Sequence, residues 1–371
     1  MDESLRKTPI YEEHQRLGAR IVPFAGWQMP IQYQGIVAEH QAVRARAGLF
    51  DVCHMGELVV KGPKAESLVN ELVTNDLSRI ADGQAMYTCC CNEQGTILDD
   101  LIIYKRATND ILIVCNASNR DKIAKHVAAF VGTQAEFEDI SDRTALLALQ
   151  GPKAFDVLDA LGTEPLSLGS VLKPFHFRTA KIGGVDCTVA RTGYTAEDGV
   201  ELFCSNEQAR KLFCGLLDAG QSFGIAPVGL GARDTLRLEG RLSLYGNDID
   251  ETTNPLEAGL GWVVKLDKPS FVGKAALLEI QRQGTARKMV GFEMLGKGIA
   301  RHGYPLLDLA GTPVGICTSG GPSPTLSKSI GLGYLPTRMS AVGTRFLVDC
   351  RGKNIEATVV KTPFYKRPRL S

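Results

Sequence analysis

The fold is indicated most clearly by residues 57–73, which read ELVVKGPKAESLVNELV. The first part, residues 57–61, is a short, mainly apolar run typical of a strand. Gly62-Pro63 then ends the strand and starts a helix, because proline is tolerated in the first turn of a helix but not in its interior. In the following segment, apolar side chains recur at helical spacing on one face, at Ala65, Leu68, Val69, Leu72 and Val73. The stretch therefore predicts a strand, a turn and a helix in succession.

The same pattern returns at residues 146–154. An apolar run from Leu146 to Gln150 is followed there by Gly151-Pro152-Lys153-Ala154. The repeated Gly-Pro-Lys-Ala sequence hints at an internal duplication. Reuse of a favourable helix start by chance explains it equally well, so the sequence leaves both explanations open.

Strands alternate with helices between the two copies. Residues 85–91 and 96–104 are predicted to form a hairpin, and residues 111–115 another strand. This alternation is typical of an α+β fold. After about Ala286 the chain changes to short strand candidates separated by glycine and proline turns, as in a small barrel or sandwich. The polar segment 281–287 is the predicted boundary between two large parts.

The chain has 371 residues and nearly balanced charge, with 42 Lys and Arg against 41 Asp and Glu. A net charge of +1 gives no general attraction to nucleic acid or to an anionic membrane. No apolar run approaches the ~20 residues that a membrane-spanning helix needs, and the first residues do not resemble a secretory signal. The expected location is the cytoplasm, or the mitochondrial matrix if the chain is a processed eukaryotic form.

Cysteine is abundant, with ten residues, but its spacing does not predict a metal site. Cys89, Cys90 and Cys91 are contiguous. Neighbours in a strand point to opposite faces, so these three sulfurs would not meet at one ion. Most of the thiols lie among apolar residues. We therefore expect small buried hydrophobic side chains in a reducing compartment, and no bound metal.

The most unusual polar feature lies in residues 97–104, ILDDLIIY, where two carboxylates stand inside an apolar run. If the whole segment is a strand, one of Asp99 and Asp100 must lie on an apolar face. A desolvated carboxylate is costly without a partner and its pKa tends to rise, which points to proton chemistry or to binding of an N–H group. The alternative is a strand that begins only after Asp100, with both acids in a turn.

Two further clusters are less specific. Asp198-Gly199 is a tight-turn signal that would bring Tyr194 and Glu201 together across a hairpin, although Glu201 could equally be an exposed strand residue. Arg233, near the start of a glycine-led helix, suits either a structural ion pair or a substrate carboxylate. The sequence contains no His-Glu-x-x-His and no Gly-x-Ser-x-Gly, which argues against hydrolase-type nucleophilic catalysis.

An ordered series of short blocks runs along nearly the whole chain. The blocks are FAGWQMP (24–30), FDVCHMG (50–56), GTILDDLI (95–102), TGYT (192–195), GARDTLRLE (231–239), LYG (244–246), TSG (318–320) and SPTL (323–326). Each block alone is weak evidence for any one family. As an ordered series they closely resemble the T-protein of the glycine cleavage system, the aminomethyltransferase family.

The resemblance implies a fold and a domain organisation. The fold is a three-domain, cloverleaf-like α+β arrangement with a ferredoxin-like αβ part and a small C-terminal β-barrel. Residues 1–283 would form the folate-binding aminomethyltransferase region, as two interleaved α+β subdomains of which one covers roughly 51–140. Residues 284–371 would form the barrel domain.

The resemblance also implies an activity. The family transfers the one-carbon unit of the aminomethyl-dihydrolipoyl arm of the H-protein to tetrahydrofolate, releasing ammonia and forming 5,10-methylenetetrahydrofolate. Tetrahydrofolate is thus the expected co-substrate and the lipoylated H-protein the expected partner. The protein itself is expected to be a monomer that binds neither nucleic acid nor membrane.

The resemblance also matches individual residues of this sequence to functional residues of the family. Asp99 matches the catalytic aspartate of the family, and Glu201 and Arg233 match its folate-contacting acid and arginine. The remaining matches are pocket-lining positions and, at the C-terminal end, a basic residue that would reach the folate tail or the H-protein: Tyr87, Asn116, Tyr194, Tyr245, Trp262 and Arg367.

Departures and alternatives accompany the resemblance. Ala196 stands where the family usually has glycine, and the run of three cysteines is not a family signature. Related folate-binding proteins of iron–sulfur cluster assembly carry a Lys-Gly-Cys-Tyr-x-Gly-Gln-Glu motif, but this chain has Ser270 at the cysteine position. A tetrahydrofolate-dependent demethylase of another methylated substrate is a further alternative. The sarcosine and dimethylglycine dehydrogenases, however, also need a flavin domain that this sequence does not show.

Overall fold

The computed structural model describes residues 5–164 and 167–368. They form two compact units. Unit 1 comprises Met1–Asn70, Leu77–Tyr87 and Leu101–Asp234, and unit 2 comprises Glu71–Asp76, Thr88–Asp100 and Thr235–Ser371. Each unit is thus built from segments that are not contiguous in the sequence.

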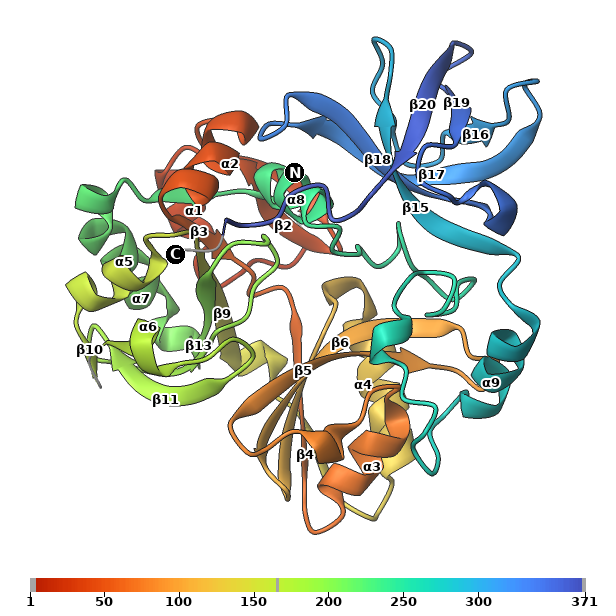
Figure 1. Ribbon diagram of the computed structural model, residues 1–371. Coiled ribbons are helices and arrows are strands. Elements are labelled where there is room, and N and C mark those ends of the chain that lie inside the picture. The colour runs from red at the N-terminus through yellow and green to blue at the C-terminus, as the bar shows by residue number, and fades with distance from the viewer. Residues whose placement is uncertain (1–4, 165–166, 369–371) are drawn as a thin grey trace. The chain divides into compact units, whose positions relative to one another are not determined.

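A seven-stranded sheet forms the core of unit 1, with strand order β10-β11-β12-β13-β9-β3-β14. Helices α5 (Ala154–Leu161) and α7 (Asn206–Ala219) pack beside each other on this sheet (Figure 1). The interior strand β9, between β13 and β3, is buried along almost its whole length, which explains its continuous apolar sequence. The strands are β3 (Gly48–Asp51), β9 (Thr144–Gln150), β10 (Thr163–Glu164), β11 (Phe177–Ile182), β12 (Val185–Ala190), β13 (Gly199–Ser205) and β14 (Ala226–Val228).

A second, five-stranded sheet has the order β5-β6-β7-β4-β8. Its helices are α3 (Ala65–Leu72) and α4 (Arg120–Val131), and α4 lies against β4 and β8. The strands are β4 (Gly56–Lys61), β5 (Gln84–Cys91), β6 (Ile97–Ala107), β7 (Asp110–Cys115) and β8 (Glu136–Asp139). The predicted strand–turn–helix at 57–73 and the predicted hairpin are confirmed.

The two sheets repeat one topology. The first is traced β4-α3-β5-β6-β7-α4-β8 and the second β9-α5-β11-β12-β13-α7-β14, with β10 and α6 (Leu168–Val171) inserted between α5 and β11. Corresponding strands also take corresponding places, except that β3 is inserted between β9 and β14. Each repeat has five strands, and without β5 or β11 its strands and helices follow the ferredoxin-like β-α-β-β-α-β order. A shared topology on this scale supports internal duplication over chance reuse of a helix start.

The turn that starts each repeat is also the same. Gly62 and Gly151 have φ of 124° and 121°, a region in which only glycine is unstrained. In both copies the backbone N–H of the alanine three residues later donates to the glycine carbonyl, over 3.0 Å. At Gly151 a Cβ would lie 2.5 Å from the carbonyl oxygen of Arg46, so close packing requires glycine there as well.

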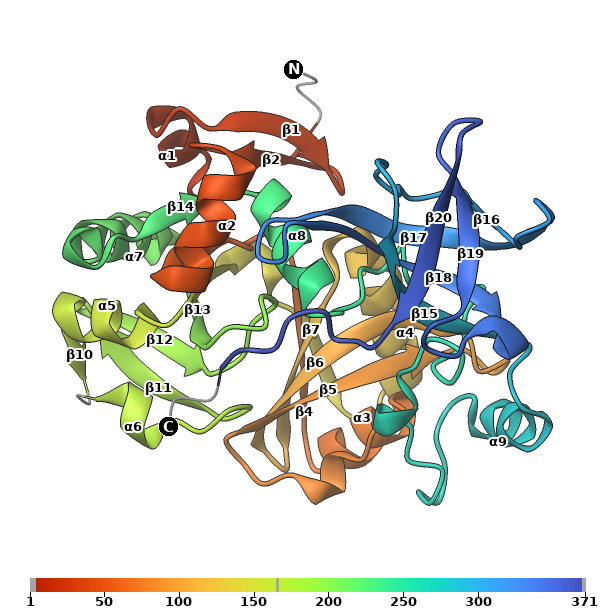
Figure 2. The same ribbon diagram turned by 45° about the horizontal axis from the view of Figure 1, so that its top comes forward.

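The last strands close a six-stranded barrel in unit 2, in the order β15-β18-β17-β16-β19-β20 (Figure 2). Pairing of β15 with β20 completes the closure. The barrel interior includes the buried rings of Phe292 and Phe346, which meet edge to face with centroids 5.3 Å apart. The strands are β15 (Arg287–Met294), β16 (Pro305–Leu307), β17 (Pro313–Ser323), β18 (Lys328–Pro336), β19 (Arg345–Asp349) and β20 (Asn354–Val360).

The predicted fold class, α+β with a ferredoxin-like part and a C-terminal barrel, is confirmed. The domain boundary at residue 284 stays a prediction. It coincides with the short segment between α9 and β15. The remaining elements are α1 (Tyr11–Arg16), β1 (Arg20–Phe24), β2 (Trp27–Gln32), α2 (Ile36–Ala45), α6 (Leu168–Val171), α8 (Leu230–Glu239) and α9 (Lys274–Gln283). Within residues 5–164 and 167–368, no helix is long and apolar enough to cross a membrane.

The run of three cysteines lies in β5 and is buried. Desolvation by the surrounding apolar side chains raises the pKa of the Cys89 and Cys91 thiols well above the ordinary value. Both therefore stay protonated at neutral pH, where a thiol is a poor nucleophile and a poor metal ligand. This environment agrees with the expected role as small hydrophobic side chains.

Candidate active site

Asp99 lies on the buried face of β6. The strand begins at Ile97, before both acids, so the alternative with Asp99 and Asp100 in a turn is wrong. Exposure alternates along the strand, with Ile97, Asp99 and Leu101 buried and Asp100 half-buried. Asp99 itself is 0% exposed. Regular strand geometry therefore selects Asp99 as the desolvated carboxylate of the pair.

The start of β6 is held by a loop of unit 2. The Tyr245 hydroxyl donates to the carbonyl oxygen of Ile97 over 3.2 Å. The N–H of Ile97 donates to the carbonyl oxygen of Thr253 over 2.9 Å. Tyr245, one of the predicted pocket residues, is thus fixed next to the strand that carries Asp99.

Glu201 occupies β13 of unit 1, where it faces Ala190 of β12 and Ala148 of β9. Its Oε2 accepts hydrogen bonds from the hydroxyls of Thr192 and, over 3.4 Å, Tyr104. Burial raises the pKa of Glu201, and the Thr192 bond, the Arg233 charge and the Tyr104 bond oppose that rise. Glu201 is therefore a half-buried carboxyl with a fixed orientation, neither fully buried nor on the exposed side of the strand.

Arg233 and Tyr194 belong to the same cluster. Arg233 lies in the first turn of α8, and its guanidinium carbon is 4.5 Å from the centroid of the Tyr194 ring. Stacking of this kind orients the planar guanidinium group and covers its face, whereas the N–H donors lie at its edges. Unit 1 therefore brings together three predicted site residues, Glu201, Arg233 and Tyr194.

The loop 191–198 connects β12 to β13 and presents Thr192 and Tyr194. The predicted tight turn at Asp198-Gly199 is wrong, because Gly199 already begins β13. The Arg191 guanidinium instead closes the loop with two hydrogen bonds to the Asp198 carboxylate, at 2.9 and 2.6 Å. A bidentate pair of this geometry fixes both ends of the loop.

A second arginine fixes the middle of the same loop. The Arg44 Nη1 donates to the Glu197 carboxylate over 3.0 Å and to the Thr195 carbonyl over 2.6 Å. The Thr195 hydroxyl in turn donates to Gln150 over 2.8 Å. The loop is thus a rigid support for the side chains that contact Glu201 and Arg233.

Ala196 lies in this loop with φ of 61°, in the left-handed region. An L-residue there costs ~1 kcal/mol, whereas glycine is unstrained but loses more entropy on folding. We expect Ala196→Gly to leave the free energy of unfolding unchanged or to raise it by up to ~1 kcal/mol. The control is Ala129→Gly on the exposed face of α4, which should lower it by ~1 kcal/mol. Equal losses for both variants in urea unfolding would contradict this account.

Four other residues were predicted for the site: Tyr87, Asn116, Trp262 and Arg367. Tyr87 and Asn116 are half-buried, Tyr87 in β5 and Asn116 directly before residues 117–119, which form a short 3₁₀ helix. Trp262 is 60% exposed, and Arg367 is exposed near the C-terminal end. Their roles stay predictions.

Two residues in contact with Glu201 were missed in the sequence, Tyr104 and Thr192. Tyr104 is buried and stacks edge to face on Phe203, with centroids 5.3 Å apart. Burial, followed by the Glu201 charge, raises the pKa of Tyr104 well above its ordinary value, so its hydroxyl remains a donor. A tyrosine at the end of an apolar run was the available signal in the sequence, but nothing in the spacing of residues linked it to Glu201.

Two of the sequence blocks that carry the family resemblance are joined by hydrogen bonds within unit 2. Glu239, at the end of α8, is 0% exposed. Its carboxylate accepts bonds from the hydroxyls of Ser323 (2.5 Å) and Thr325 (2.7 Å) and from the Thr325 N–H (3.1 Å). The last part of the GARDTLRLE block and the SPTL block are therefore tied to each other.

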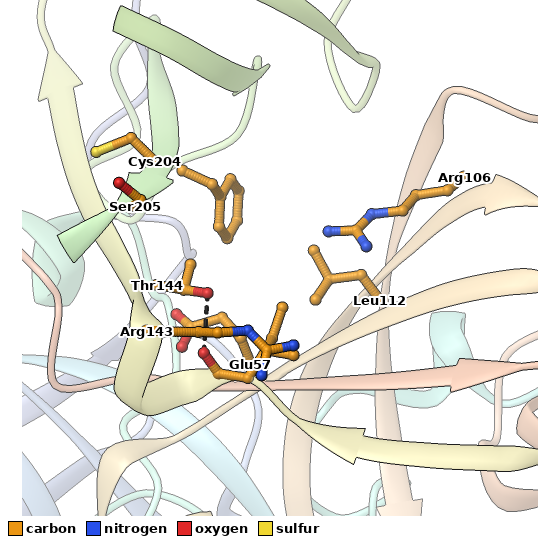
Figure 3. A pocket seen from close by; sticks show the side chains of 9 residues that line it. Glu57, Arg106, Leu112, Arg143, Thr144, Cys204 and Ser205 are labelled. Atoms are coloured by element: carbon orange, nitrogen blue, oxygen red, sulfur yellow. Dashed lines mark hydrogen bonds between the residues drawn. The ribbon is translucent and has the colours of Figure 1, made fainter. Parts of the chain in front are cut away.

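Unit 1 also contains a pocket of about 280 Å³ (Figure 3). In this view Arg106 and Leu112 lie on one side, Cys204 and Ser205 on the other, and Glu57 and Thr144 between them. The pocket is lined by Glu57, Arg106, Leu112, Ile140, Arg143, Thr144, Phe203, Cys204 and Ser205. None of the predicted site residues is in this set.

Glu57 is the unusual member of that pocket. It is 0% exposed, and neither carboxyl oxygen has a hydrogen-bond partner in residues 5–164 and 167–368. Burial raises the pKa of Glu57 well above its ordinary value, although the Arg120 charge opposes the rise. Burial therefore favours the protonated, neutral form of Glu57 in the folded protein.

Among the described residues, no group of three or more His, Cys, Asp or Glu side chains is arranged to hold a metal ion. The polar groups of the site are instead carboxyl, hydroxyl and guanidinium groups. They suit an organic substrate with N–H donors and polar or anionic groups.

An α+β framework with a C-terminal barrel and an acid–arginine cluster fits a protein that binds such a ligand. Comparison with known families makes this specific. Residues 10–268 match the GCVT N-terminal domain, and residues 287–366 match the glycine cleavage T-protein C-terminal barrel domain. The chain belongs to the glycine cleavage T-protein family.

Individual relatives agree over the full length. The chain is 48% identical over 367 residues to an aminomethyltransferase of Caldanaerobacter subterraneus, covering 98% of this chain and 97% of the relative. It is 47% identical to an aminomethyltransferase of Halothermothrix orenii, covering 97% and 100%. The crystal structure of the glycine cleavage system aminomethyltransferase T from Bartonella henselae superposes with a TM-score of 0.92 at 36% identity, covering 98% and 99%. The predicted family and its aminomethyltransferase activity are confirmed.

Proposed function

We propose that the chain transfers the one-carbon unit of the aminomethyl-dihydrolipoyl arm of an H-protein to tetrahydrofolate. Overall, the methylene carbon loses its bonds to nitrogen and sulfur and gains bonds to two folate nitrogens. Of the two protons that leave those nitrogens, one goes to the departing amine and one to the sulfur. The products are ammonia, the dihydrolipoyl arm and 5,10-methylenetetrahydrofolate.

The observation that carries the folate assignment is the hydrogen bonding of Glu201. Its Oε2 accepts from Thr192 and Tyr104, while no bond to its Oε1 is formed within residues 5–164 and 167–368. That oxygen can accept from the amide-like N–H groups of a pterin ring. The neighbouring Arg233 supplies donors for a polar or anionic folate group. The residues therefore fit the proposed co-substrate.

Asp99 is proposed as the acid–base group. Ammonia is a poor leaving group until its nitrogen is protonated, and a positioned carboxyl group can deliver or accept such a proton. The same carboxylate, when ionised, stabilises the positive charge of a methylene-iminium group. Its complete burial makes that electrostatic effect stronger than it would be in water.

A reducing compartment, the cytoplasm, is the proposed location. All ten cysteines are free, and eight of them are buried. Thiols close to one another in sequence, as in the run in β5, persist unpaired under reducing conditions. The free thiols therefore support the location expected from the sequence.

The folate assignment is tested by a thermal scan with and without tetrahydrofolate. A ligand that binds only the folded state adds ~2.7 kcal/mol of apparent stability at a hundredfold excess over Kd. We expect Glu201→Ala to abolish most of the resulting upward shift in Tm. Glu136→Ala, on the exposed edge strand β8, should retain it. The absence of a shift in the parent protein at saturating tetrahydrofolate would contradict the assignment.

The donor is tested separately by measuring ammonia release from aminomethylated H-protein. Release should depend on tetrahydrofolate and should saturate with H-protein. If folate binds but ammonia is not released, the H-protein is not the donor, and another methylated substrate must be sought.

A further inference from the structure

A buried ion pair lies at the base of the loop that holds β6. Asp248 is 0% exposed and Arg237, on α8, is 2% exposed. The Arg237 Nη1 donates to the Asp248 Oδ2 over 2.5 Å. The other Asp248 oxygen accepts from the Thr318 hydroxyl over 2.6 Å, and the Arg237 Nη2 donates to Ser319 over 2.8 Å. Both charges are thus fully engaged inside unit 2.

The same carboxylate organises the backbone of its own loop. The Asp248 Oδ2 accepts from the N–H of Leu244 over 3.0 Å, and the N–H of Asp248 donates to the Leu244 carbonyl over 2.8 Å. The Asp248 carbonyl accepts from the Tyr334 hydroxyl of β18 over 2.9 Å. Asp248 therefore fixes the loop to α8 and to two barrel strands at once.

This loop holds both peptide groups of Ile97. Tyr245, next to Leu244, donates to the Ile97 carbonyl, and Thr253, at the far end of the loop, accepts from the Ile97 N–H. Asp99 follows two residues later on the same buried face, roughly 6.6 Å along the strand. A displacement of the loop would therefore also shift the Asp99 carboxylate, because only residues 97–99 of the strand lie between them.

The ion pair is not explained by stability alone. Replacing a buried pair by apolar residues of similar size is often neutral or stabilising, because the desolvation of two charges offsets their attraction. The distinctive effect of the ion pair is that its hydrogen bonds have fixed directions. The Asp248 carboxylate accepts from Arg237, Thr318 and the Leu244 N–H, and donors at such fixed positions allow only one loop conformation.

We propose that Asp248 is a positioning residue for the transfer reaction, acting through the 244–253 loop and Ile97 to hold Asp99 in place. This inference rests on the proposed role of Asp99. Asp248 does not touch the substrates. Its loss should therefore affect the rate of the chemical step more than folate affinity.

The test is a double-mutant cycle on kcat with aminomethylated H-protein and tetrahydrofolate. Asp248→Asn keeps the size of the side chain but loses the charge that binds Arg237. We expect it to lower kcat by up to about 10²-fold, as a 1 Å misplacement of a reacting group can do, with a KM for tetrahydrofolate within about threefold of the parent. In an Asp99→Asn background the same change should lower kcat by less than about threefold, because no carboxylate remains to be positioned there.

Two further variants separate positioning from folding. Thr318→Val deletes one hydrogen bond to Asp248 with little change of shape, so it should cause a smaller loss with the same dependence on Asp99. It serves as the readout if Asp248→Asn does not fold. Phe346→Leu weakens the barrel core without touching the loop, and should lower Tm while leaving kcat unchanged.

The outcomes differ for the two assignments. Equal losses in the parent and Asp99→Asn backgrounds, or no loss in either positioning variant, would overturn the role of Asp248 and leave the role of Asp99 untouched. Near-normal turnover of Asp99→Asn by itself would instead overturn the proposed role of Asp99, and this inference with it.

Discussion

Replacing Asp99 with asparagine should lower turnover by about 10²–10⁴-fold, the usual effect of removing a general acid–base group. Asparagine has the size of aspartate and keeps one carbonyl acceptor, but it neither relays a proton nor carries the charge that stabilises an iminium. Tetrahydrofolate binding should fall much less, because the amide still accepts one hydrogen bond. Ammonia release measures the first effect and a ligand-dependent thermal shift the second.

Asp100→Asn is the matched control. Asp100 is adjacent in sequence but faces the other side of β6 and is half-buried. We expect its turnover to remain within a few-fold of the parent. A dead Asp100→Asn beside an active Asp99→Asn would show that the catalytic carboxylate has been assigned to the wrong residue.

Replacing Glu57 with glutamine should stabilise the protein increasingly as the pH rises. Below the ordinary pKa of 4.5, the carboxyl is protonated in both folded and unfolded chains, so the pH has no effect through Glu57. Above it the unfolded chain ionises, while Glu57 in the folded chain, whose pKa is raised, ionises only at higher pH. The folded parent then loses up to ~1.4 kcal/mol per pH unit until the folded pKa is reached. Glutamine does not titrate and escapes this loss.

The measurement is the free energy of urea unfolding of parent and Glu57→Gln at pH values from about 4 to about 8, which span the ordinary pKa and neutral pH. The difference between them should be smallest at the acidic end and should grow toward the alkaline end. Glu136→Gln, on the exposed edge of the same sheet, should run parallel to the parent at every pH. A constant difference between parent and Glu57→Gln would mean that Glu57 is ionised in the folded protein.

The fold was largely predictable because its signals are local. The strand–turn–helix at 57–73 follows from an apolar run, one glycine and helical spacing, and the structure repeats it at 144–161. β16 could not be predicted in this way, because it has only three residues, Pro305–Leu307, and pairs through contacts distant in sequence. Short strands of this kind are determined by their neighbours rather than by their own composition.

The site was predictable only in part, because much of it depends on contacts between residues that are distant in sequence. Alternation along β6 limits the choice to one acid of a pair, and the strand start then selects Asp99. The shape of the 191–198 loop depends on ion pairs between distant residues, such as Arg44 with Glu197. The burial of Glu57 likewise depends on Phe203 and on residues 140–144, which nothing in its own strand reveals.

The pairing of β15 with β20 also has a consequence for the colloidal behaviour of the chain. In a closed barrel every strand has a neighbour on both sides, so the barrel has no edge strand that is open along its length to another molecule. A chain truncated before Asn354 would lose β20 and would expose the edges of both β15 and β19. Such edges are templates for strand addition between molecules. Loss of these last residues is therefore expected to cause self-association and precipitation, in addition to any loss of turnover.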